Sequence, residues 1–420
     1  MATRFGTALV CAAILIIQPV SEANATSAPS VTTSVLYVGG GVGVISAELP
    51  SGCNTVYLTA DFTTWRNVSP PNKVVAGSCL YVWTSASFVS PTNGWLLGRN
   101  MGSTVTVLER TTDGGKTWSR QPGDTTGSNA GAEAIAFVNA AVGWRQQFSW
   151  GANSYKLSRT LNGGTTWTTR AYYPRTGCPM LSDVFSSASV GFAGSPLAGS
   201  TMSVGSVNLP YVWRTINGGA TWLKMVLARP SSVPIHATGL YGLPVFAGRI
   251  GTLPIDYPVG GHQDLFFYSS RDYGIHWSLI TTVASPLVVL GAVTLNENAV
   301  AQGCYASDTV AKGSLASVSL VNPSTWWILR PSSTGNSERF VVQNGSVSTL
   351  KIKFLPDTAG RAVLQAASST KAVVTLGKSV GPFHVFVTVD GGAEWYPLSP
   401  PSQTGNQFTE WFGGGGITKS

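Results

Sequence analysis

The sequence is poor in charged residues, in histidine and in long regular hydrophobic patterns. Only 10% of the 420 residues are charged, with 18 acidic residues and 26 Lys or Arg, and there are four His. No helical periodicity is sustained along the chain, which excludes a helical bundle or coiled coil. Gly-x-Ser-x-Gly, His-Glu-x-x-His, Cys-x-x-Cys and phosphate-loop patterns are absent, so no motif indicates a metal or cofactor.

Glycine and aromatic residues are abundant by contrast. The chain has 48 Gly and 14 Trp, and short apolar runs of four to seven residues alternate with Gly, Pro, Asn and Ser. Such runs, bounded by turn formers, are typical of strands. The composition therefore predicts an all-β protein.

The N-terminal segment has the pattern of a signal peptide. Arg4 precedes an apolar run from Leu9 to Ile17, and Ala23-Asn24-Ala25 offers a cleavage site. We expect a signal peptide at 1–25, a single domain at 26–412 and a flexible tail at 413–420. No later stretch is long enough for a transmembrane helix, so we expect a secreted or periplasmic protein, cleaved near Ala25.

Four cysteines follow the expected cleavage site: Cys53, Cys79, Cys178 and Cys304. An even number in an exported chain indicates two disulfides, with three pairings open. The short separation favours Cys53–Cys79, which would leave Cys178 with Cys304.

One phrase recurs along the chain. It reads Thr-Thr-Asp-Gly-Gly-Lys-Thr-Trp at 111–118, with copies at 160–167, 215–222, 270–277 and 388–395, and a shortened copy at 59–65. Asp or Asn can accept hydrogen bonds from the backbone N–H groups that follow, Gly supplies a positive φ, and Trp anchors the returning strand. We therefore assign a structural role to these residues: Asp113, Gly115, Trp118, Asn162, Gly164, Trp167, Asn217, Gly219, Trp222, Asp272, Gly274, Trp277, Asp390, Gly392 and Trp395.

The phrase resembles the Asp-box, or bacterial neuraminidase repeat, Ser/Thr-x-Asp-x-Gly-x-x-Trp. This resemblance implies a β-propeller with the turn between the third and fourth strands of each blade. An apolar strand and Gly-Trp before the turn also make the chain similar to photosystem II stability/assembly factor propellers, which are non-enzymatic scaffolds. Sialidases are a more distant resemblance, and their Phe/Tyr-Arg-Ile-Pro motif is absent.

The spacing of the repeats predicts the number of blades. The Asp or Asn positions are 61, 113, 162, 217, 272 and 390, and the last interval is twice the others. One blade has thus lost its signature, with a turn expected at 343–345. We predict a seven-bladed propeller of four-stranded antiparallel blades, with six or eight blades as alternatives. Val35 to Val38 could close the ring with a strand near Phe408 to Phe412.

Two groups of aromatic and arginine residues accompany this pattern. Five aromatic residues are expected to pack between blades: Trp95, Trp144, Phe192, Phe246 and Trp327. Arg110, Arg159 and Arg214 directly precede repeat turns and are expected to be structural.

The face opposite the repeat turns is the expected ligand face, because the strand 2–3 loops would meet there. The longest of these loops are predicted at 194–210 and 249–264, with a long connector at 170–183. Arginine suits carboxylate recognition, and aromatic rings suit a sugar or peptide groove. The candidate binding residues are Arg99, Arg145, Arg249, Arg330, Trp150, Tyr172, Tyr173, Arg175, Tyr257 and His262.

Catalysis has less support from the residues. A glycoside hydrolase needs two carboxyl groups across the bond, and the acids near the expected face are Asp183, Asp256 and Asp264. Three hypotheses stay open. The first is a non-catalytic binding or scaffold protein; the others are a glycoside hydrolase of the sialidase-like or xyloglucan-active type and a structural envelope protein.

The net charge of +8 favours an acidic partner, such as a protein or an anionic glycan at the cell envelope. No basic run indicates nucleic-acid binding. We expect a monomer without a metal or cofactor. The scarcity of carboxylates also predicts tolerance of low pH.

Overall fold

The structure is a computed structural model. It describes residues 33–39, 41–48, 53–71, 74–75, 78–100, 105–122, 130–149, 154–174, 184–193, 201–204, 207–237, 240–241, 244–260, 262–283, 292–293, 312–313, 317–330, 337–343, 346–352, 361–377 and 384–398. The expected signal peptide and C-terminal tail lie outside these residues, as do Cys178 and Cys304, so predictions about them are untested.

The strands form small antiparallel sheets whose members follow one another along the chain. The first sheet contains β1 (Thr33–Gly39), β2 (Val42–Glu48), β3 (Asn54–Thr59) and β4 (Arg66–Asn67). The second contains β7 (Tyr81–Phe88), β8 (Gly94–Asn100), β9 (Thr106–Thr111) and β10 (Ser119–Arg120). The third contains β11 (Ala130–Phe137), β12 (Gly143–Ser149), β13 (Ser154–Thr160) and β14 (Thr168–Pro174).

The next two sheets have five strands. The fourth contains β15 (Val184–Phe185), β16 (Gly191–Ala193), β17 (Thr201–Val204), β18 (Val207–Thr215) and β19 (Leu223–Val226). The fifth contains β20 (Leu240–Tyr241), β21 (Val245–Ala247), β22 (Ile250–Val259), β23 (His262–Ser270) and β24 (Ser278–Val283).

Two four-stranded sheets complete the series. One contains β27 (Ser317–Asn322), β28 (Thr325–Arg330), β29 (Ser337–Gln343) and β30 (Ser346–Ile352), and the last contains β31 (Arg361–Ala366), β32 (Ala372–Gly377), β33 (His384–Thr388) and β34 (Tyr396–Leu398). The short strands β5 (Val74–Val75) and β6 (Ser78–Cys79) pair separately, as do β25 (Ala292–Val293) and β26 (Lys312–Gly313).

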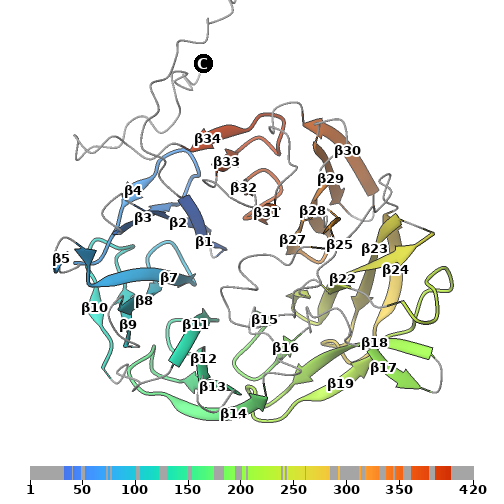
Figure 1. Cartoon of the computed structure of the whole chain (residues 1–420), viewed down its shortest axis with the longest axis horizontal. Helices are drawn as coiled ribbons and strands as arrows, with labels where there is room; N and C mark the ends of the chain where they lie inside the picture. The colour runs from blue at the N-terminus through green and yellow to red at the C-terminus, as the bar shows by residue number, and fades with distance from the viewer. Residues whose placement is uncertain are drawn as a thin grey trace, which may run out of the picture. The chain divides into compact units, whose positions relative to one another are not determined.

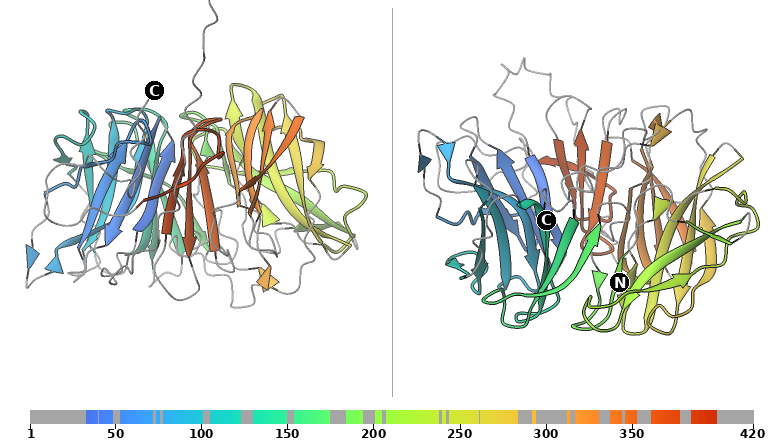
Figure 2. Two further views of the ribbon diagram at one scale, coloured as in Figure 1. Left: turned by 90° about the horizontal axis from the view of Figure 1, so that it is seen from above. Right: turned by 60° about the horizontal axis from the view of Figure 1, so that its bottom comes forward.

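Figure 1 shows these sheets side by side around a common centre, with the early strands of each sheet inside and the last strand outside. The side views in Figure 2 show the same sheets packed face to face around the ring. This arrangement is a β-propeller, as the sequence predicted. We refer to the first five sheets, in chain order, as the first to fifth blades and to the β31–β34 sheet as the last blade.

Six blades carry a turn of the repeated form between their last two strands, centred on Asp61, Asp113, Asn162, Asn217, Asp272 and Asp390. We call these the repeat turns. The β27–β30 sheet has a different form: Gln343 pairs with Ser346 across a short hairpin, without the repeat turn. Six blades with the repeat turn are therefore present. The predicted seventh blade would have to be the β27–β30 sheet, which lacks this turn.

The hydrogen bonds of the repeat turns explain their sequence. In the second blade the Asp113 carboxylate accepts bonds from the Thr111 hydroxyl at 2.8 Å and from the Thr117 N–H at 2.9 Å. The Gly115 N–H donates to the Thr111 hydroxyl oxygen at 2.7 Å. The N–H groups reached by the Asp or Asn are mostly four residues ahead, rather than the two or three that are usual for such side chains. The Ser or Thr two residues before the Asp, which the sequence analysis left unassigned, is buried in all six turns.

The repeat turns also explain why the strand 1–2 turns share their face. Gly114 N–H donates to the Thr92 carbonyl at 2.8 Å, and Gly163 N–H donates to Ala141 at the same distance. Equivalent bonds join Gly218 to Ser189 and Tyr273 to Arg249. Gly391 donates to Thr370 in the same way, so the repeat turns of these five blades are bonded to the strand 1–2 turns of their own blades.

The residue after the Asp or Asn has a positive φ. It is Gly114, Gly163, Gly218 and Gly391 in four copies, with φ between 67° and 78°. Two copies hold a side chain instead: Phe62 has a φ of 67° and Tyr273 a φ of 58°. A side chain in this left-handed region costs about 1–2 kcal/mol relative to a right-handed conformation.

Aromatic side chains join one blade to the next. A second-strand aromatic stacks on a first-strand Phe of the following blade, and the Trp of that blade's repeat turn meets the Phe edge-on. In one copy Trp95 stacks on Phe137 at a centroid distance of 3.6 Å, and Trp167 lies 6.2 Å from Phe137. The copies are Trp95, Phe137 and Trp167; Trp144, Phe185 and Trp222; and Phe192, Phe246 and Trp277.

The prediction that these aromatics pack between blades is confirmed, with one correction. Phe246 belongs to the first strand of its blade, β21, and not to the second, because it pairs with Gly251 as Phe137 pairs with Gly143. The glycine allows this contact, since a Cβ at position 143 would lie 2.3 Å from the Phe137 ring.

Polar bonds reinforce the same junctions. Trp95 Nε1 donates to the Gly163 carbonyl at 2.9 Å, and Trp144 Nε1 donates to Gly218 at 3.1 Å. The arginines that precede the repeat turns cover these tryptophans: the Arg110 guanidinium lies 5.3 Å from the Trp95 ring centroid and that of Arg159 lies 5.6 Å from Trp144. The structural role predicted for these arginines is confirmed.

The first and last blades pack against each other through an apolar cluster, and their described strands belong to separate sheets. β1 pairs with β2, Val35 opposite Ile45. β1 is the end strand of its sheet, and residues 408–412 lie outside the described residues, so the predicted pairing of Val35 to Val38 with a C-terminal strand stays a prediction. The cluster comprises Ile45, Ala47, Tyr57, Phe62, Trp65, Val373, Val385, Val387 and Leu398.

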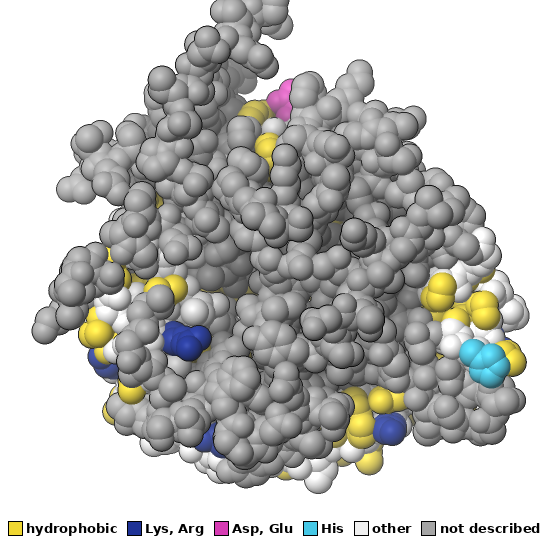
Figure 3. Space-filling model, in the orientation of Figure 1, with side chains coloured by type: hydrophobic (Ala, Val, Ile, Leu, Met, Phe, Trp, Pro, Cys, Tyr) yellow, Lys and Arg dark blue, Asp and Glu magenta, His cyan; other side chains and the backbone are white. Residues whose placement is uncertain are grey.

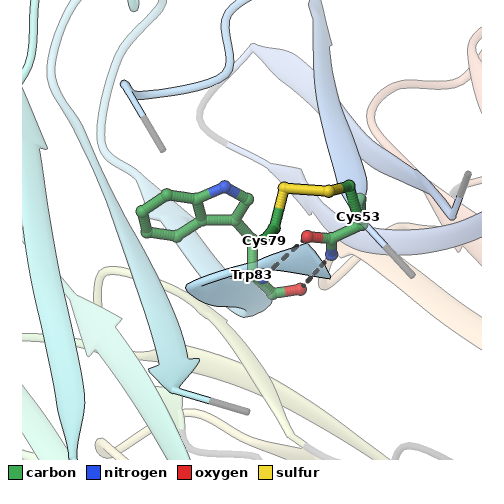
Figure 4. The surroundings of a disulfide bond; sticks show 4 residues. Cys53, Cys79 and Trp83 are labelled. Atoms are coloured by element: carbon green, nitrogen blue, oxygen red, sulfur yellow. Dashed lines mark hydrogen bonds between the residues drawn. A yellow bond between two sulfur atoms is a disulfide. The ribbon is translucent and has the colours of Figure 1, made fainter. Parts of the chain in front are cut away.

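A disulfide joins Cys53 to Cys79, as predicted, with 5.0 Å between the Cα atoms. Beside it, the Asn54 side chain exchanges two hydrogen bonds with the Trp83 backbone, at 2.8 and 3.0 Å (Figure 4). These contacts tie the third strand of the first blade to the first strand of the second. A loop of 26 residues corresponds to about 3.5 kcal/mol of chain-entropy stabilisation.

Three of the predicted long loops are partly strands. Residues 249–264 form most of a hairpin of β22 and β23, and residues 201–204 and 207–210 form the hairpin of β17 with the start of β18. Tyr172 and Tyr173 lie in β14, where they pair with Lys156 and Tyr155, and so are not in a connector. Each run was misjudged because Pro, Gly and Ser interrupt its apolar pattern.

The blade junctions give a first prediction. Replacing Trp144 by Ala removes a ring that is 1% exposed and stacked at 3.5 Å on Phe185. We expect a loss of about 3–5 kcal/mol in the free energy of unfolding, from lost burial and the cavity left behind, measured by urea titration. The control is Leu161→Ala, which is 63% exposed and should change stability by less than about 0.5 kcal/mol. Equal effects of the two changes would contradict the junction's importance.

The repeat turns give a prediction for acid. Burial raises the pKa of Asp61, but hydrogen bonds from Thr64, Thr63 and Thr59 outweigh it and hold the pKa at about 2. The pKa of Asp272 is about 2 for the same reasons, with His276 and Ser270 as donors. Because these folded-state pKa values lie below the unfolded values, this stabilisation is complete above about pH 4 and is lost as the pH falls towards 2.

The double variant Asp61→Asn/Asp272→Asn tests this. Asn already serves in the turns at Asn162 and Asn217, so the fold should be kept. We expect a shallower loss of stability between pH 5 and 2, by at most about 1 kcal/mol per residue because solvent screens these accessible groups. Urea titrations across this range are the measurement, and parallel curves for both proteins would contradict it.

Candidate functional site

The predicted arginine group does not come together. Arg145 is 3% exposed and lies within the blades, its guanidinium 4.9 Å from the Trp167 ring centroid, with an Nη2 bond to Gln147 at 3.3 Å. Burial lowers its pKa to about 10. Arg145 is therefore a core residue, and the prediction that it faces a ligand is wrong.

The other arginines lie at different ends of their blades. Arg249 is in the strand 1–2 turn, where its carbonyl accepts the Tyr273 N–H at 3.0 Å, so it lies on the repeat-turn face. Arg330 ends β28 opposite Glu338, towards the strand 2–3 connection, and Arg99 is exposed near the end of β8. The prediction placed Arg249 on the opposite face because it took residues 249–264 as a loop, whereas Arg249 lies in the turn between β21 and β22.

The predicted aromatic residues are also dispersed. Tyr257 is 1% exposed and packs edge-on against Phe266 at a centroid distance of 5.5 Å, so it belongs to the core. Tyr172 and Tyr173 lie in the outermost strand of the third blade, and His262 begins β23. Trp150 and Arg175 fall outside the described residues.

The candidate carboxylates do not form a pair across a cleft. Asp256 pairs with Leu265, whereas Asp264 pairs with Tyr257. These register positions have opposite parity, so the strand pairing does not bring the two residues to one face of the sheet. Asp183 lies outside the described residues.

Within the described ranges, no group of three or more His, Cys, Asp or Glu side chains could hold a metal ion. No helix in the same part of the chain is long and apolar enough to cross a membrane.

The structure instead shows an exposed apolar surface that the sequence analysis missed. Large hydrophobic side chains that are more than 40% exposed lie between residues 161 and 280, in the third, fourth and fifth blades. Five of them lie on or beside the repeat turns: Leu161, Ile216, Ile250, Tyr273 and Ile275. We call these five the turn-side surface.

Hydrogen bonds between blades hold the turn-side surface together. Arg170 Nη2 of the third blade donates to the Asn217 carbonyl of the fourth at 2.6 Å. Arg214 Nε of the fourth blade donates to the Tyr273 carbonyl of the fifth at 2.7 Å. The repeat turns that carry the exposed side chains are thus bonded from one blade to the next.

More exposed apolar side chains continue onto the outer strands, at Leu223 and Val226 of β19 and at Leu279 and Ile280 of β24. Figure 3 shows hydrophobic side chains of described residues at several places around the edge of the ring, among them the right-hand edge, where the blade that contains β22 to β24 lies in Figure 1. A sequence signal for this surface exists: Leu161 and Ile216 occupy a turn position that is Ala60 and Thr112 in the first two blades.

No family model matches the chain, and no curated protein matches it. Among solved structures, the chain is similar to an uncharacterized protein from Listeria monocytogenes, with 8% identity, 89% of this chain and 96% of that chain covered, and a TM-score of 0.51. It is also similar to the β-propeller domain of the Trilobed protease from Pyrococcus furiosus, with 8% identity, coverages of 89% and 99%, and a TM-score of 0.49.

A further similar structure is YCF48 from Cyanidioschyzon merolae, with 17% identity, coverages of 86% and 94%, and a TM-score of 0.43. At these identities the similarity concerns the fold alone.

The position of Arg145 gives a prediction. Replacing Arg145 by Glu puts an acidic group where a stacked guanidinium lies buried, and we expect a loss of about 3–5 kcal/mol in stability. Arg145→Met keeps the length of the side chain without a charge and should cost less. Denaturant titration of both variants is the measurement. A stable, folded Arg145→Glu protein would show that the site is open to solvent and would restore the ligand-facing interpretation.

Proposed function

We propose that the protein is an exported, non-catalytic propeller that binds a partner protein and acts as a scaffold. The observation that carries this proposal is the concentration of exposed apolar side chains on the third to fifth blades. Soluble monomers rarely expose contiguous apolar patches larger than roughly a few hundred Å², and larger ones mark interaction sites. The turn-side surface also differs from the same turn positions in the first two blades, which hold Ala60 and Thr112.

The rigidity of the blade junctions supports a scaffold role. The exposed side chains are carried by turns whose backbones are hydrogen-bonded within a blade and between blades. A partner would therefore meet a preformed surface, and little ordering cost would oppose binding.

We also infer that the repeat turns are Asp-boxes and that the β27–β30 sheet is a seventh blade. Its Trp326 stacks on Phe267 of the fifth blade at 4.1 Å, and its Trp327 meets Trp395 of the last blade at 6.3 Å. The sheet thus contacts a neighbour on each side. As in the photosystem II assembly factor resemblance, the Asp, Asn, Gly and Trp of the turns would serve structure, and the exposed apolar side chains beside them would bind.

Export is part of the proposal. The Cys53–Cys79 disulfide suits an oxidising compartment, in keeping with the signal peptide expected at 1–25. The strand 2–3 face, with Arg99, Arg330 and His262, stays a second candidate surface on the sequence argument alone.

The test uses a matched pair of variants. Leu161→Asp/Ile216→Asp places charges on the turn-side surface, and Ala60→Asp/Thr112→Asp places the same charges at the same turn positions of the first two blades. We expect capture of a partner from extracts of the source cells to fall at least tenfold for the first variant only. A hydrolysis screen on sialosides and xyloglucan should show no turnover.

Two results would overturn the proposal. One is equal capture by both variants, or no specific capture by the natural protein. The other is hydrolysis that disappears in Asp256→Asn or Asp264→Asn, which would establish a glycoside hydrolase instead.

A further inference from the structure

Tyr273 occupies a backbone position that four other repeat turns give to glycine. Its φ of 58° lies in the left-handed region, which side chains rarely adopt, whereas Gly114, Gly163, Gly218 and Gly391 adopt it without steric cost. A strained residue persists where the surroundings hold it in place, and such residues cluster at functional sites.

Phe62 shows how a side chain at this position can be compensated. It has a φ of 67° at the equivalent place in the first blade, but its ring is 1% exposed and packs against Trp65 at a centroid distance of 6.3 Å. The Phe62 side chain thus contributes to the cluster between the first and last blades. Tyr273 is 50% exposed, so folding buries only half of its side chain against the protein.

The backbone of Tyr273 is held from both sides. Its carbonyl accepts the bond from Arg214 Nε at 2.7 Å, and its N–H donates to the Arg249 carbonyl at 3.0 Å. The ring is therefore presented by a fixed turn. Ile250 directly follows Arg249, and Ile275 lies two residues after Tyr273. Both isoleucines are 45% exposed.

The charges around these three side chains are mainly positive. Arg249 and Arg271 are exposed beside them. The carboxylate of Asp272, between Arg271 and Tyr273 in the chain, is occupied by its own turn: it accepts bonds from Ser270 at 2.8 Å and from the His276 N–H at 2.9 Å, and it meets His276 Nδ1 at 2.6 Å. Two exposed arginines thus lie within two residues of Ile250 or Tyr273 in the sequence.

We propose that Tyr273, Ile250 and Ile275, bordered by Arg249 and Arg271, form the docking site for a protein segment that combines apolar side chains with Asp or Glu. This inference rests on the proposed function and names its central site. Tyr and Arg are the residues that most often anchor protein interfaces, with an apolar centre inside a polar rim. The isoleucines favour a protein over a glycan, because they offer a sugar no hydrogen bonds.

Synthetic peptides of defined composition test the proposal with the full-length mature protein. The probe is a twelve-residue peptide of alternating Glu and Leu, and the comparison peptides replace every Glu by Lys or every Leu by Ser. We expect the first peptide to bind at least tenfold more tightly than either comparison. Its affinity should fall as salt rises from 50 to 500 mM, because screening weakens the contacts with the arginines.

Variants then locate the binding. Tyr273→Gly should weaken peptide binding at least tenfold without lowering the urea midpoint, because Gly relieves the backbone strain while the ring is lost. Phe62→Gly is the matched control at the equivalent turn position, and it should lower the urea midpoint and leave peptide binding unchanged. Arg249→Glu/Arg271→Glu should also weaken binding of the acidic peptide at least tenfold and abolish the fall in affinity with salt, because screening then weakens a repulsion.

Different failures separate the two proposals. Peptide binding that is unchanged in Tyr273→Gly, or equal for all three peptides, would overturn this site. If Leu161→Asp/Ile216→Asp still reduced capture of a natural partner, the proposed function would stand with its centre elsewhere. Absence of both peptide binding and partner capture would overturn both proposals.

Discussion

The stacking of aromatic rings between neighbouring blades is the contact on which the ring depends. A propeller blade is a small twisted sheet that cannot bury its faces alone, so its stability comes from the next blade. Here a second-strand aromatic, a first-strand Phe and a repeat-turn Trp supply this burial at three successive junctions. Where rings are fewer, as between the first and last blades, aliphatic side chains join Phe62 and Trp65 instead.

The repeat turn serves this same contact. Its Asp or Asn fixes the turn, the buried Ser or Thr receives the Gly N–H, and the turn places a Trp where the next ring is needed. Since the same turns accept bonds from Arg and Trp of the preceding blade, their backbones are held firmly. Rigid turns can carry exposed side chains without losing their shape, which links the construction of the blades to the turn-side surface.

The placement of function on this fold differs from what a propeller sequence suggests. Arg145 and Tyr257 have residue types common in binding sites, yet both are buried, where the guanidinium lies against Trp167 and the phenol ring against Phe266. Leu161 and Ile216 have types common in cores, yet they are exposed on turns. Residue type alone therefore misleads in a chain where charge is scarce and aromatics are abundant.

The sequence by itself determined the all-β propeller, the repeat turns, the blade-joining aromatics and the Cys53–Cys79 bridge. The turns follow from local chemistry, through hydrogen bonds within a few residues and a positive φ at Gly. The propeller follows from the regular spacing of the repeats. Only the tertiary structure decided that residues 249–264 are mostly hairpin, that Arg145 is buried, that Asp256 and Asp264 have opposite parity, and that apolar side chains gather on three blades. Those facts depend on strand register and on contacts between blades, which sequence spacing does not specify, because a shift of one residue moves a side chain to the other face.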